Sequence, residues 1–382
     1  MLPQIGSKVL KDFNIATGVL LDPYCGSGSS FASGLECGIT EMYGYDINPL
    51  AILISKAKFT KLSIDELHQT RQQLRNEIFE FLKDENNVNK LVIPSITNIY
   101  YWFSKEVINN LTIVKYCIDK IKNENIKYFF LISFSETVRE CSYTRNSEFK
   151  LYRMKSEDIL HFNPDVIGMY FKKLEESFFI YGRHYFPKLK NDISITLKNS
   201  VFKAKPNFYD VVLTSPPYGD SKTTVAYGQF STLSNEWLGI KYARKIDAML
   251  MGGTNNKGIY NKGILADYIS QINEIDNKRA LEVSAFYFDL GDSITQVANS
   301  IKKGGKAIYI VGNRTVKNVQ LPTDQFIAEQ FEANNCSHLL TYERAISNKA
   351  MPNRNSPSNI MGQTASTMLY EYIIVVEKRQ VE

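Results

Sequence analysis

The sequence predicts an α/β domain built on a parallel sheet and interrupted by a large helical insertion. Near the N-terminus, short apolar runs alternate with a glycine loop and with helical segments, which is the pattern of successive strand–helix units. From residue 63 to about residue 188 this alternation stops and helical spacing dominates. Strand-like runs return after Lys190. We therefore expect one domain made of residues 1–60 and 190–382, with residues 61–189 inserted as a helical region.

The first expected strand covers residues 18–22 and is followed by the loop Pro-Tyr-Cys-Gly-Ser-Gly-Ser-Ser and by a helix that ends near Gly38. Residues 42–46 form the second expected strand. Asn48-Pro49 then opens a helix, because proline is favoured at the first helical position. This order of elements predicts a parallel sheet.

The rest of the chain divides into helices and later strands. In the insertion, helical spacing is clearest over 65–82 and 98–123. Strands are expected at residues 193–197, 210–214, 306–311 and 368–376. Polar, Gly- and Asn-rich loops lie at 220–224, 252–262 and 349–363. Ligands of open α/β sheets bind outside the carboxyl ends of strands, so we expect these loops to hold the substrate.

The composition is that of an ordinary globular protein. The 382 residues include 45 Lys and Arg against 40 Asp and Glu, a net charge of +5. No apolar run approaches the roughly 18 residues of a membrane span, and the N-terminus resembles neither a signal nor a transit peptide, so we expect a cytoplasmic protein without membrane contact. The five cysteines and four histidines are scattered, without CxxC or HExxH, so we expect no metal site.

The segment Asp22-Pro-Tyr-Cys-Gly-Ser-Gly carries the first chemical signal. Gly26 and Gly28 let the backbone approach a ligand, and the following helix offers free N–H groups. Asp46, at the end of the second strand, can accept hydrogen bonds from a ribose diol. The carboxylate of Asp22 would repel a pyrophosphate, but it suits a cationic ligand such as a sulfonium that carries an amino group.

This loop has three other possible interpretations. A dinucleotide site needs a third Gly or Ala where this chain has Phe31. A phosphate loop needs Gly-x4-Gly-Lys-Ser/Thr, which the chain lacks. A tight turn with only a structural role stays open.

The second signal is Thr214-Ser215-Pro216-Pro217-Tyr218-Gly219, directly after a strand. Two successive prolines fix the backbone and remove two donors, so the carbonyls of the loop stay available as acceptors. The hydroxyl of Ser215 adds an acceptor and Tyr218 adds a flat ring. An amino group on a planar heterocycle needs these parts, although such a string alone is as often an ordinary rigid loop.

Together the two motifs resemble those of the S-adenosylmethionine-dependent amino-group DNA methyltransferases, which carry Asp-Pro-Phe-Cys-Gly-Ser-Gly and Asp/Asn/Ser-Pro-Pro-Tyr/Phe. The stretch Tyr-Gly-Tyr-Asp-Ile-Asn-Pro-Leu-Ala from residue 43, Lys-Gly-Gly-Lys from 303 and the strand from 367 are also similar to family motifs. The resemblance implies a Rossmann-like class I methyltransferase sheet, double-stranded DNA as substrate and a cognate restriction endonuclease as partner.

Carried over residue by residue, the resemblance assigns two sets of site residues. The residues expected to bind S-adenosylmethionine are Asp22, Tyr24, Gly26, Gly28, Asp46, Ile47 and Thr214. The residues expected to hold the target base are Ser215, the carbonyl of Pro216, and Tyr218.

Three departures from the family pattern matter. One is that the insertion of residues 61–189 separates the two main motifs, so we expect it to be the DNA-recognition region. The helix that usually precedes the first motif is shortened to the segment that begins at Pro3, which raises the question of a native start further upstream. The region of the third motif reads Leu-Lys-Asn-Ser, so Asn199 is the nearest counterpart of the Asp that the family often places near the adenine amino group.

The insertion contains a basic, aromatic stretch between residues 139 and 155, which we expect to contact DNA. Lys and Arg contacts to phosphates give most of the affinity of a protein for DNA. The candidates are Arg139, Arg145, Lys150 and Arg153. The alternative for each one is a solvated helix face.

The sequence thus predicts methyl transfer from S-adenosylmethionine to the exocyclic amine of a base flipped out of DNA. Ser-Pro-Pro-Tyr members of the family mostly methylate N4 of cytosine, which we favour over N6 of adenine. An RNA or protein methyltransferase and a non-catalytic DNA-binding subunit are the alternatives. The large insertion argues against the first of these, and the two intact motifs argue against the second.

Overall fold

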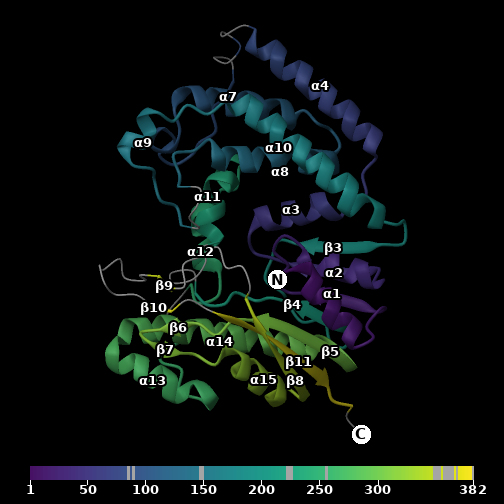
Figure 1. Cartoon of the computed structure of the whole chain (residues 1–382), viewed down its shortest axis with the longest axis vertical. Coiled ribbons are helices and arrows are strands. Elements are labelled where there is room, and N and C mark those ends of the chain that lie inside the picture. The colour runs from purple at the N-terminus through teal and green to yellow at the C-terminus, as the bar shows by residue number, and fades with distance from the viewer. Residues whose placement is uncertain are drawn as a thin grey trace. The chain divides into compact units, whose positions relative to one another are not determined.

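A computed structural model describes residues 1–83, 87, 91–145, 150–220, 227–253, 257–346, 354–355, 365–366 and 369–380 (Figure 1). The chain forms two compact units. The sheet unit consists of Met1–Ile47, Ser194–Ala226 and Asp247–Glu382, and the helical unit consists of Asn48–Ile193 and Tyr227–Ile246.

The sheet unit contains a seven-stranded sheet in the order β3-β2-β1-β4-β5-β11-β8. Its strands are β1 (Val19–Asp22), β2 (Glu41–Tyr45), β3 (Ser194–Lys198), β4 (Tyr209–Thr214), β5 (Ile301–Val311), β8 (Cys336–Ala345) and β11 (Tyr370–Lys378). The pairings from β3 through β5 are parallel, and β11 runs antiparallel to both of its neighbours. The expected α/β fold with a mostly parallel sheet is therefore confirmed.

The order of the strands reverses between β1 and β4. The chain moves outward from β1 to β2 and β3 on one side, and from β4 to β5 on the other. Such a switch point is where open α/β sheets bind their ligands, at the carboxyl ends of the strands. Both motifs of the sequence begin here, because β1 ends at Asp22 and β4 ends at Thr214.

Both faces of the sheet are covered by helices, which explains the almost uninterrupted apolar sequence of the central strands. Leu21 and Val212 belong to a core cluster shared with α13 (Ala266–Ile275), α14 (Asn277–Ser300) and α15 (Thr323–Ala333). Other elements of the sheet unit are η4 (Gly263–Leu265) and the short strand pairs β6 (Thr315–Val316) with β7 (Val319–Gln320) and β9 (Arg354–Asn355) with β10 (Ala365–Ser366).

The N-terminal helix begins at Pro3, where the sequence placed its start. Helix α1 (Pro3–Asp12) is ten residues long, with Pro3 in its first turn, and it packs against α2 (Ser29–Cys37). A side chain at Gly6 would collide with Ser33 of α2, and it would touch Leu213 of β4 at 3.0 Å. Glycine therefore allows α1 to approach the sheet closely.

The helical unit differs in its bounds from the expected insertion of residues 61–189. It begins at Asn48 and also contains residues 227–246, because α3 and α11 pack against α8. Its elements are α3 (Pro49–Phe59), α4 (Ile64–Leu82), α6 (Ile99–Trp102), α7 (Lys105–Asp119), α8 (Glu124–Glu140), α9 (Ser156–Leu160), α10 (Val166–Ile180), α11 (Tyr227–Trp237), η1 (Tyr181–Tyr185), η2 (Phe186–Lys188) and η3 (Ala243–Lys245), while α12 (Ile246–Met249) begins at its boundary. The helix expected over 98–123 is two helices, since Ser104 caps α7 by accepting from the N–H of Val107 at 3.2 Å.

A buried polar contact joins α3 to α11 within this unit. The Asn48 side chain caps α3 by accepting from the N–H of Leu50. Its amide donates to Ser231 at 3.0 Å, and its oxygen accepts from Asn235 at 3.1 Å. These bonds satisfy polar groups that would otherwise be costly to bury.

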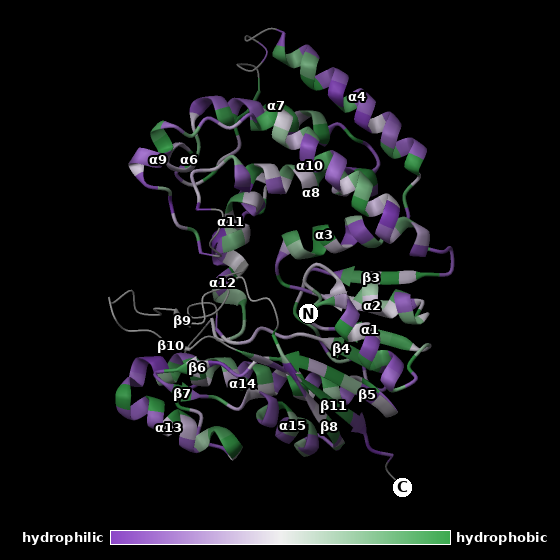
Figure 2. Cartoon of the chain, viewed as in Figure 1, coloured by the Kyte–Doolittle hydropathy of each residue, from purple (hydrophilic) through white to green (hydrophobic). Residues whose placement is uncertain are grey.

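Hydropathy follows this architecture. In Figure 2 β5 is hydrophobic toward its carboxyl end, whereas α4 carries hydrophilic residues along much of its length. In the part of the chain that the structure describes, no helix combines the length and apolarity needed to cross a membrane.

Candidate active site

Asp22 joins the two motif loops at the switch point. One carboxylate oxygen accepts from the Thr214 hydroxyl at 2.6 Å and from the N–H of Tyr24 at 3.0 Å. The other accepts from the Ser30 hydroxyl, at the start of α2, at 2.5 Å. Asp22 and Thr214 are both buried, so their polar groups bind each other rather than facing outward.

Burial also changes the acidity of Asp22. Removal from water raises the pKa of this carboxyl to about 6, despite opposing hydrogen bonds from Ser30, Thr214 and the N–H of Tyr24. Nearby Asp46 adds to the increase. Burial thus disfavours the ionised form of Asp22. A buried carboxyl with three hydrogen-bond donors around it suits a residue that positions the glycine loop.

The glycine loop curves back onto the end of β2. Gly26 has φ +49° and Gly28 has φ +84°, a region that favours glycine, and Gly28 immediately precedes α2. A Cβ atom at Gly26 would meet no atom within 4 Å. The backbone is therefore approachable at Gly26, as close contact with a ligand requires.

Asp46 lies beside this loop and is partly exposed. Its carboxylate accepts from the N–H of Gly26 at 2.9 Å. The backbone N–H of Asp46 donates to the carbonyl of Lys198 at 3.2 Å, and its carbonyl accepts from the Asn199 side chain at 2.9 Å. Ile47, also partly exposed, follows directly. Loop and strand end thus hold Asp46 with its carboxylate against the glycine loop.

Tyr24 connects the glycine loop to α14. Its hydroxyl forms a short hydrogen bond with the hydroxyl of Ser293, and burial raises the pKa of the phenol above its ordinary value. Ser293 was not among the expected site residues. It lies on a long amphipathic helix far along the chain, where a serine gives no sequence signal.

The loop after β4 carries a chain of hydroxyl groups. The Ser215 hydroxyl donates to the Tyr218 oxygen at 3.3 Å, and the Tyr218 hydroxyl donates to Glu371 of β11 at 3.1 Å. Ser215 and Tyr218 are partly exposed, whereas Pro216 is buried. Glu371 and its partner Arg344 of β8 were not anticipated from the sequence.

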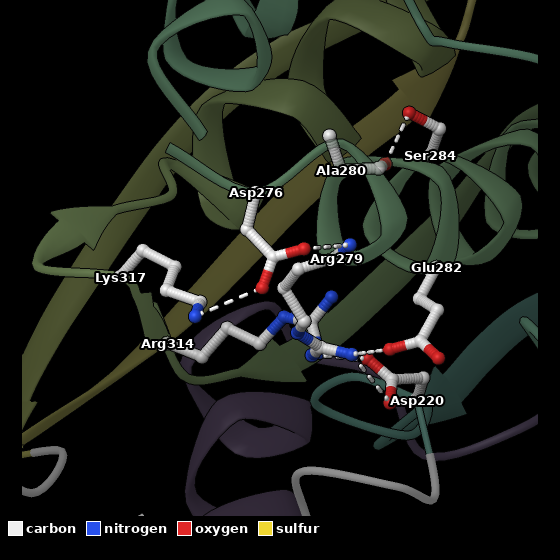
Figure 3. A network of polar contacts seen from close by, with 8 residues as sticks. All are labelled: Asp220, Asp276, Arg279, Ala280, Glu282, Ser284, Arg314 and Lys317. Atoms are coloured by element: carbon white, nitrogen blue, oxygen red, sulfur yellow. Dashed lines mark hydrogen bonds and ion pairs between the residues drawn. The ribbon is translucent and has the colours of Figure 1, made fainter. Parts of the chain in front are cut away.

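The end of this loop is fixed by a buried ionic network (Figure 3). Asp220 is 1% exposed and accepts from Arg279 of α14 at 2.8 Å and from Arg314 at 2.6 Å. Arg279 also donates to Glu282 at 2.6 Å. A side chain at Gly219 would collide with the Arg314 guanidinium. Glycine here allows the loop to lie against the network.

The network strongly favours the charged form of Asp220. Burial alone would raise the pKa of Asp220, but the facing guanidinium groups of Arg314 and Arg279 outweigh it and hold the pKa well below its usual range. The loop after Tyr218 is thus anchored by a carboxylate whose ionised form the two guanidinium groups stabilise.

The basic stretch of the helical unit is divided between buried and exposed groups. Arg139 is buried, its guanidinium donates to the carbonyl of Phe230 at 2.9 Å, and it lies over the Phe230 ring. Arg139 therefore packs inside the helical unit, and the expectation that it contacts DNA is corrected. Arg153 lies over the Tyr101 and Tyr143 rings and donates to the carbonyl of Tyr101.

Arg145 and Lys150 lie at the end of a paired segment. Residues 143–145 run antiparallel to residues 152–154, with hydrogen bonds from Arg145 to Tyr152 and from Met154 to Tyr143. Arg145 is exposed and Lys150 is partly exposed. Residues 146–149 lie outside the described part of the chain, as do 221–226, 254–256, 347–353 and 356–364, which contain much of the expected substrate loops.

Comparison with known proteins places the chain in a family. It is 39% identical over 383 residues to the type II methyltransferase M.MvaI of Kocuria varians, covering 94% of this chain and 84% of that protein. It is 33% identical over 84 residues to the type II methyltransferase M.MjaII of Methanocaldococcus jannaschii, covering 22% of this chain and 16% of that protein.

Other similarities are weaker. No protein-family model matches the chain. A solved structure described as a "putative S-adenosylmethionine dependent methyltransferase" from Listeria monocytogenes aligns over 99% of both chains, but with 9% identity and a TM-score of only 0.33. The extent of the similarity to M.MvaI is sufficient: the chain belongs to the type II methyltransferases, the S-adenosylmethionine-dependent DNA methyltransferases of restriction–modification systems.

Proposed function

We propose that this DNA methyltransferase modifies the exocyclic amine of a base flipped out of double-stranded DNA, with N4 of cytosine as the favoured target. The observation that carries the proposal is the hydrogen bond between Asp22 and Thr214. It ties the glycine loop to the start of the Ser-Pro-Pro-Tyr loop, so a methyl donor on one loop lies beside an amine held by the other.

The residues of the glycine loop fit S-adenosylmethionine. Asp46 offers a partly exposed carboxylate for the ribose diol, and the open space above Gly26 admits a ligand against the backbone. Ile47 follows Asp46 directly and is partly exposed, which supports its proposed role beside the adenine. When bound, the cofactor supplies an electrophilic methyl group on its sulfonium. We revise the role of Asp22 and Thr214 from cofactor contact to positioning, because both side chains are buried and bind each other.

The Ser-Pro-Pro-Tyr loop fits an aromatic amine. The lone pair of such an amine is delocalised into the ring, so the amine is a weak nucleophile until it is oriented. Ser215 and the carbonyl of Pro216 accept its N–H bonds, and Tyr218 stacks on the base. Proximity and orientation then supply most of the catalysis.

The preference for cytosine rests on the resemblance of the Ser215 loop to one branch of the family, not on the chemistry of its hydroxyl. Family members with Ser at this position mostly methylate N4 of cytosine, whereas those with Asp or Asn mostly methylate N6 of adenine. Both bases present the same N–C–NH2 edge, so the loop alone does not separate them.

The test uses labelled S-adenosylmethionine with DNA, transfer RNA and a protein extract as competing acceptors. We expect label in DNA alone, and mass spectrometry of the digested DNA should find N4-methylcytosine. N6-methyladenine as the sole product would overturn the cytosine assignment. A product methylated on carbon, or label confined to RNA or protein, would overturn the amine proposal. Tyr218→Ala is the inactive control.

We propose that DNA is also contacted by Arg145 and Lys150, which lie at the end of the paired segment 143–145/152–154. A restriction endonuclease that recognises the same DNA site is the proposed partner in the cell.

A further inference from the structure

A carboxylate on the sheet terminates the hydroxyl chain of the Ser-Pro-Pro-Tyr loop. One oxygen of Glu371 accepts from the Tyr218 hydroxyl at 3.1 Å, and the other accepts from Arg344 at 2.5 Å. Glu371 and Arg344 are direct partners in the antiparallel ladder between β11 and β8. The strand pairing therefore fixes the position of the carboxylate, and the side chain of Glu371 is 15% exposed.

The chemistry of these groups sets the direction of each hydrogen bond. An ionised carboxylate can only accept, so the single hydroxyl proton of Tyr218 points to Glu371. The Tyr218 oxygen is then left as an acceptor, and it takes the hydroxyl proton of Ser215 at 3.3 Å. With its only proton committed, the Ser215 oxygen can offer nothing but lone pairs to a third group.

We infer that Glu371 is a positioning residue that acts through Tyr218 to make Ser215 an obligate hydrogen-bond acceptor. This inference rests on the proposed function and deepens it. A Ser215 oxygen that can only accept suits the N–H of an exocyclic amine and leaves a keto oxygen at the same place unpaired. Glu371 thus selects amino-bearing bases, although it does not touch the base itself.

The variant that separates polarity from packing is Glu371→Gln. Glutamine has nearly the same shape, but its amide offers donors as well as an acceptor, so the direction of the hydroxyl chain is no longer enforced. We expect the single-turnover rate of methylation on unmethylated phage DNA to fall roughly ten- to a hundred-fold. The Kd for S-adenosylmethionine and the melting temperature should stay near those of the wild type.

The matched control is Glu377→Gln on the same strand. Glu377 also faces a cation across a strand pair, since it binds Lys306 of β5 at 2.6 Å, whereas the hydroxyl chain ends at Glu371. Its substitution should leave the methylation rate unchanged. An equal loss of rate in both variants would show that removal of any carboxylate from β11 impairs the sheet, and would overturn the inference.

A double-mutant cycle with Tyr218→Phe tests the route. Phenylalanine keeps the ring but removes the hydroxyl, so we expect a rate loss similar to that of Glu371→Gln, and less than a further two-fold loss when both are combined. A wild-type rate in Tyr218→Phe, or additive losses in the double variant, would overturn the inference. If Glu371→Gln does not fold, the methylation rate of Tyr218→Phe alone tests the inference.

These experiments distinguish a failure of the inference about Glu371 from a failure of the proposed function. If the wild-type product carries no methylated amine, the proposed function fails before any variant is compared. If the wild type methylates an amine and Glu371→Gln retains its full rate, only the inference about Glu371 fails.

Discussion

At the scale of single residues, we propose two tasks for the carboxylate of Asp46, which are to shape the glycine loop and to bind the ribose of the cofactor. This carboxylate accepts from the N–H of Gly26 at 2.9 Å, which shapes the glycine loop, and the residue is partly exposed. A carboxylate has about four acceptor sites, so both tasks are compatible.

Asp46→Ala should therefore weaken S-adenosylmethionine binding roughly ten- to a hundred-fold, as expected for the loss of charge-assisted hydrogen bonds. Titration calorimetry measures this directly. The control is Glu41→Ala at the opposite end of β2, where the carboxylate accepts from the Tyr43 hydroxyl at 2.9 Å. Unchanged affinity in a folded Asp46 variant would remove this residue from the cofactor site.

The sequence predicted which residues begin the two loops but not what their side chains do. Asp22 and Thr214 were assigned to the cofactor by the resemblance of their motifs to those of the family. The structure shows that the two groups satisfy each other, a relation between residues 192 positions apart. A local sequence pattern cannot predict a hydrogen bond between residues so far apart in the chain. Glu371 escaped notice for the same reason, since its partner Tyr218 is 153 positions away.

At the scale of elements, the junction of β1 and β4 has a measurable acid–base signature. The pKa of Asp22 is raised from 3.8 to about 6 in the folded protein, so the native state binds its proton more tightly than the unfolded chain. The stability contributed by the protonated form is full below about pH 4 and is lost as the pH rises through about 6. The loss amounts to roughly 3 kcal/mol.

Asp22→Asn isolates this effect, because asparagine stays neutral while its oxygen can still accept from Thr214 and Tyr24. The free energy of unfolding of the wild type minus that of the variant should fall by about 3 kcal/mol between about pH 4 and about pH 7. Urea titrations at several pH values measure the difference. A difference independent of pH would mean that Asp22 ionises as it does in the unfolded chain.

The junction of β4 with α14 depends on the buried network of Asp220. Asp220→Asn leaves Arg279 and Arg314 without the carboxylate that neutralises them, and we expect a loss of about 3–5 kcal/mol in unfolding free energy. Asp276→Asn is the control at the rim, since its ion pair with Lys317 is 34–42% exposed and asparagine also caps helices well. That variant should lose less stability than Asp220→Asn. Equal losses would contradict a special role for the buried network.

Element boundaries show where local patterns failed. Strand β8 has a largely exposed sequence without the apolar alternation of a half-buried strand, and it was not anticipated. Its place beside β11 is set by pairing across the ladder rather than by its own pattern. The expected strand from residue 368 begins at Tyr370 instead, and residues 367–368 lie outside the described part of the chain.

At the scale of the whole molecule, we propose that DNA binding uses the helical unit as well as the sheet unit. The sheet unit contains both motif loops, whose proposed site residues are carboxylates and neutral acceptors rather than cations. The helical unit is composed of residues that interrupt the chain between the two motifs, from Asn48 to Ile193, together with residues 227–246. A polyanionic substrate needs cations. Arg145 ends the first half of the paired segment 143–145/152–154, and Lys150 lies shortly before its second half.

Replacing Arg145 and Lys150 with Gln should weaken DNA binding and flatten its dependence on salt. The plot of the logarithm of the association constant against the logarithm of the salt concentration has a negative slope. Its magnitude should decrease by about one unit for each phosphate that the variant no longer neutralises, because each neutralised phosphate releases roughly one condensed counterion. Fluorescence anisotropy between low and moderate salt gives the slope. Lys8→Gln with Lys11→Gln on α1 removes the same number of charges from the sheet unit, where the lysines bind Asp12 and Glu36, and should leave the slope unchanged. Equal slopes in the wild type and in the Arg145 and Lys150 variant would place the DNA-binding surface elsewhere on the molecule.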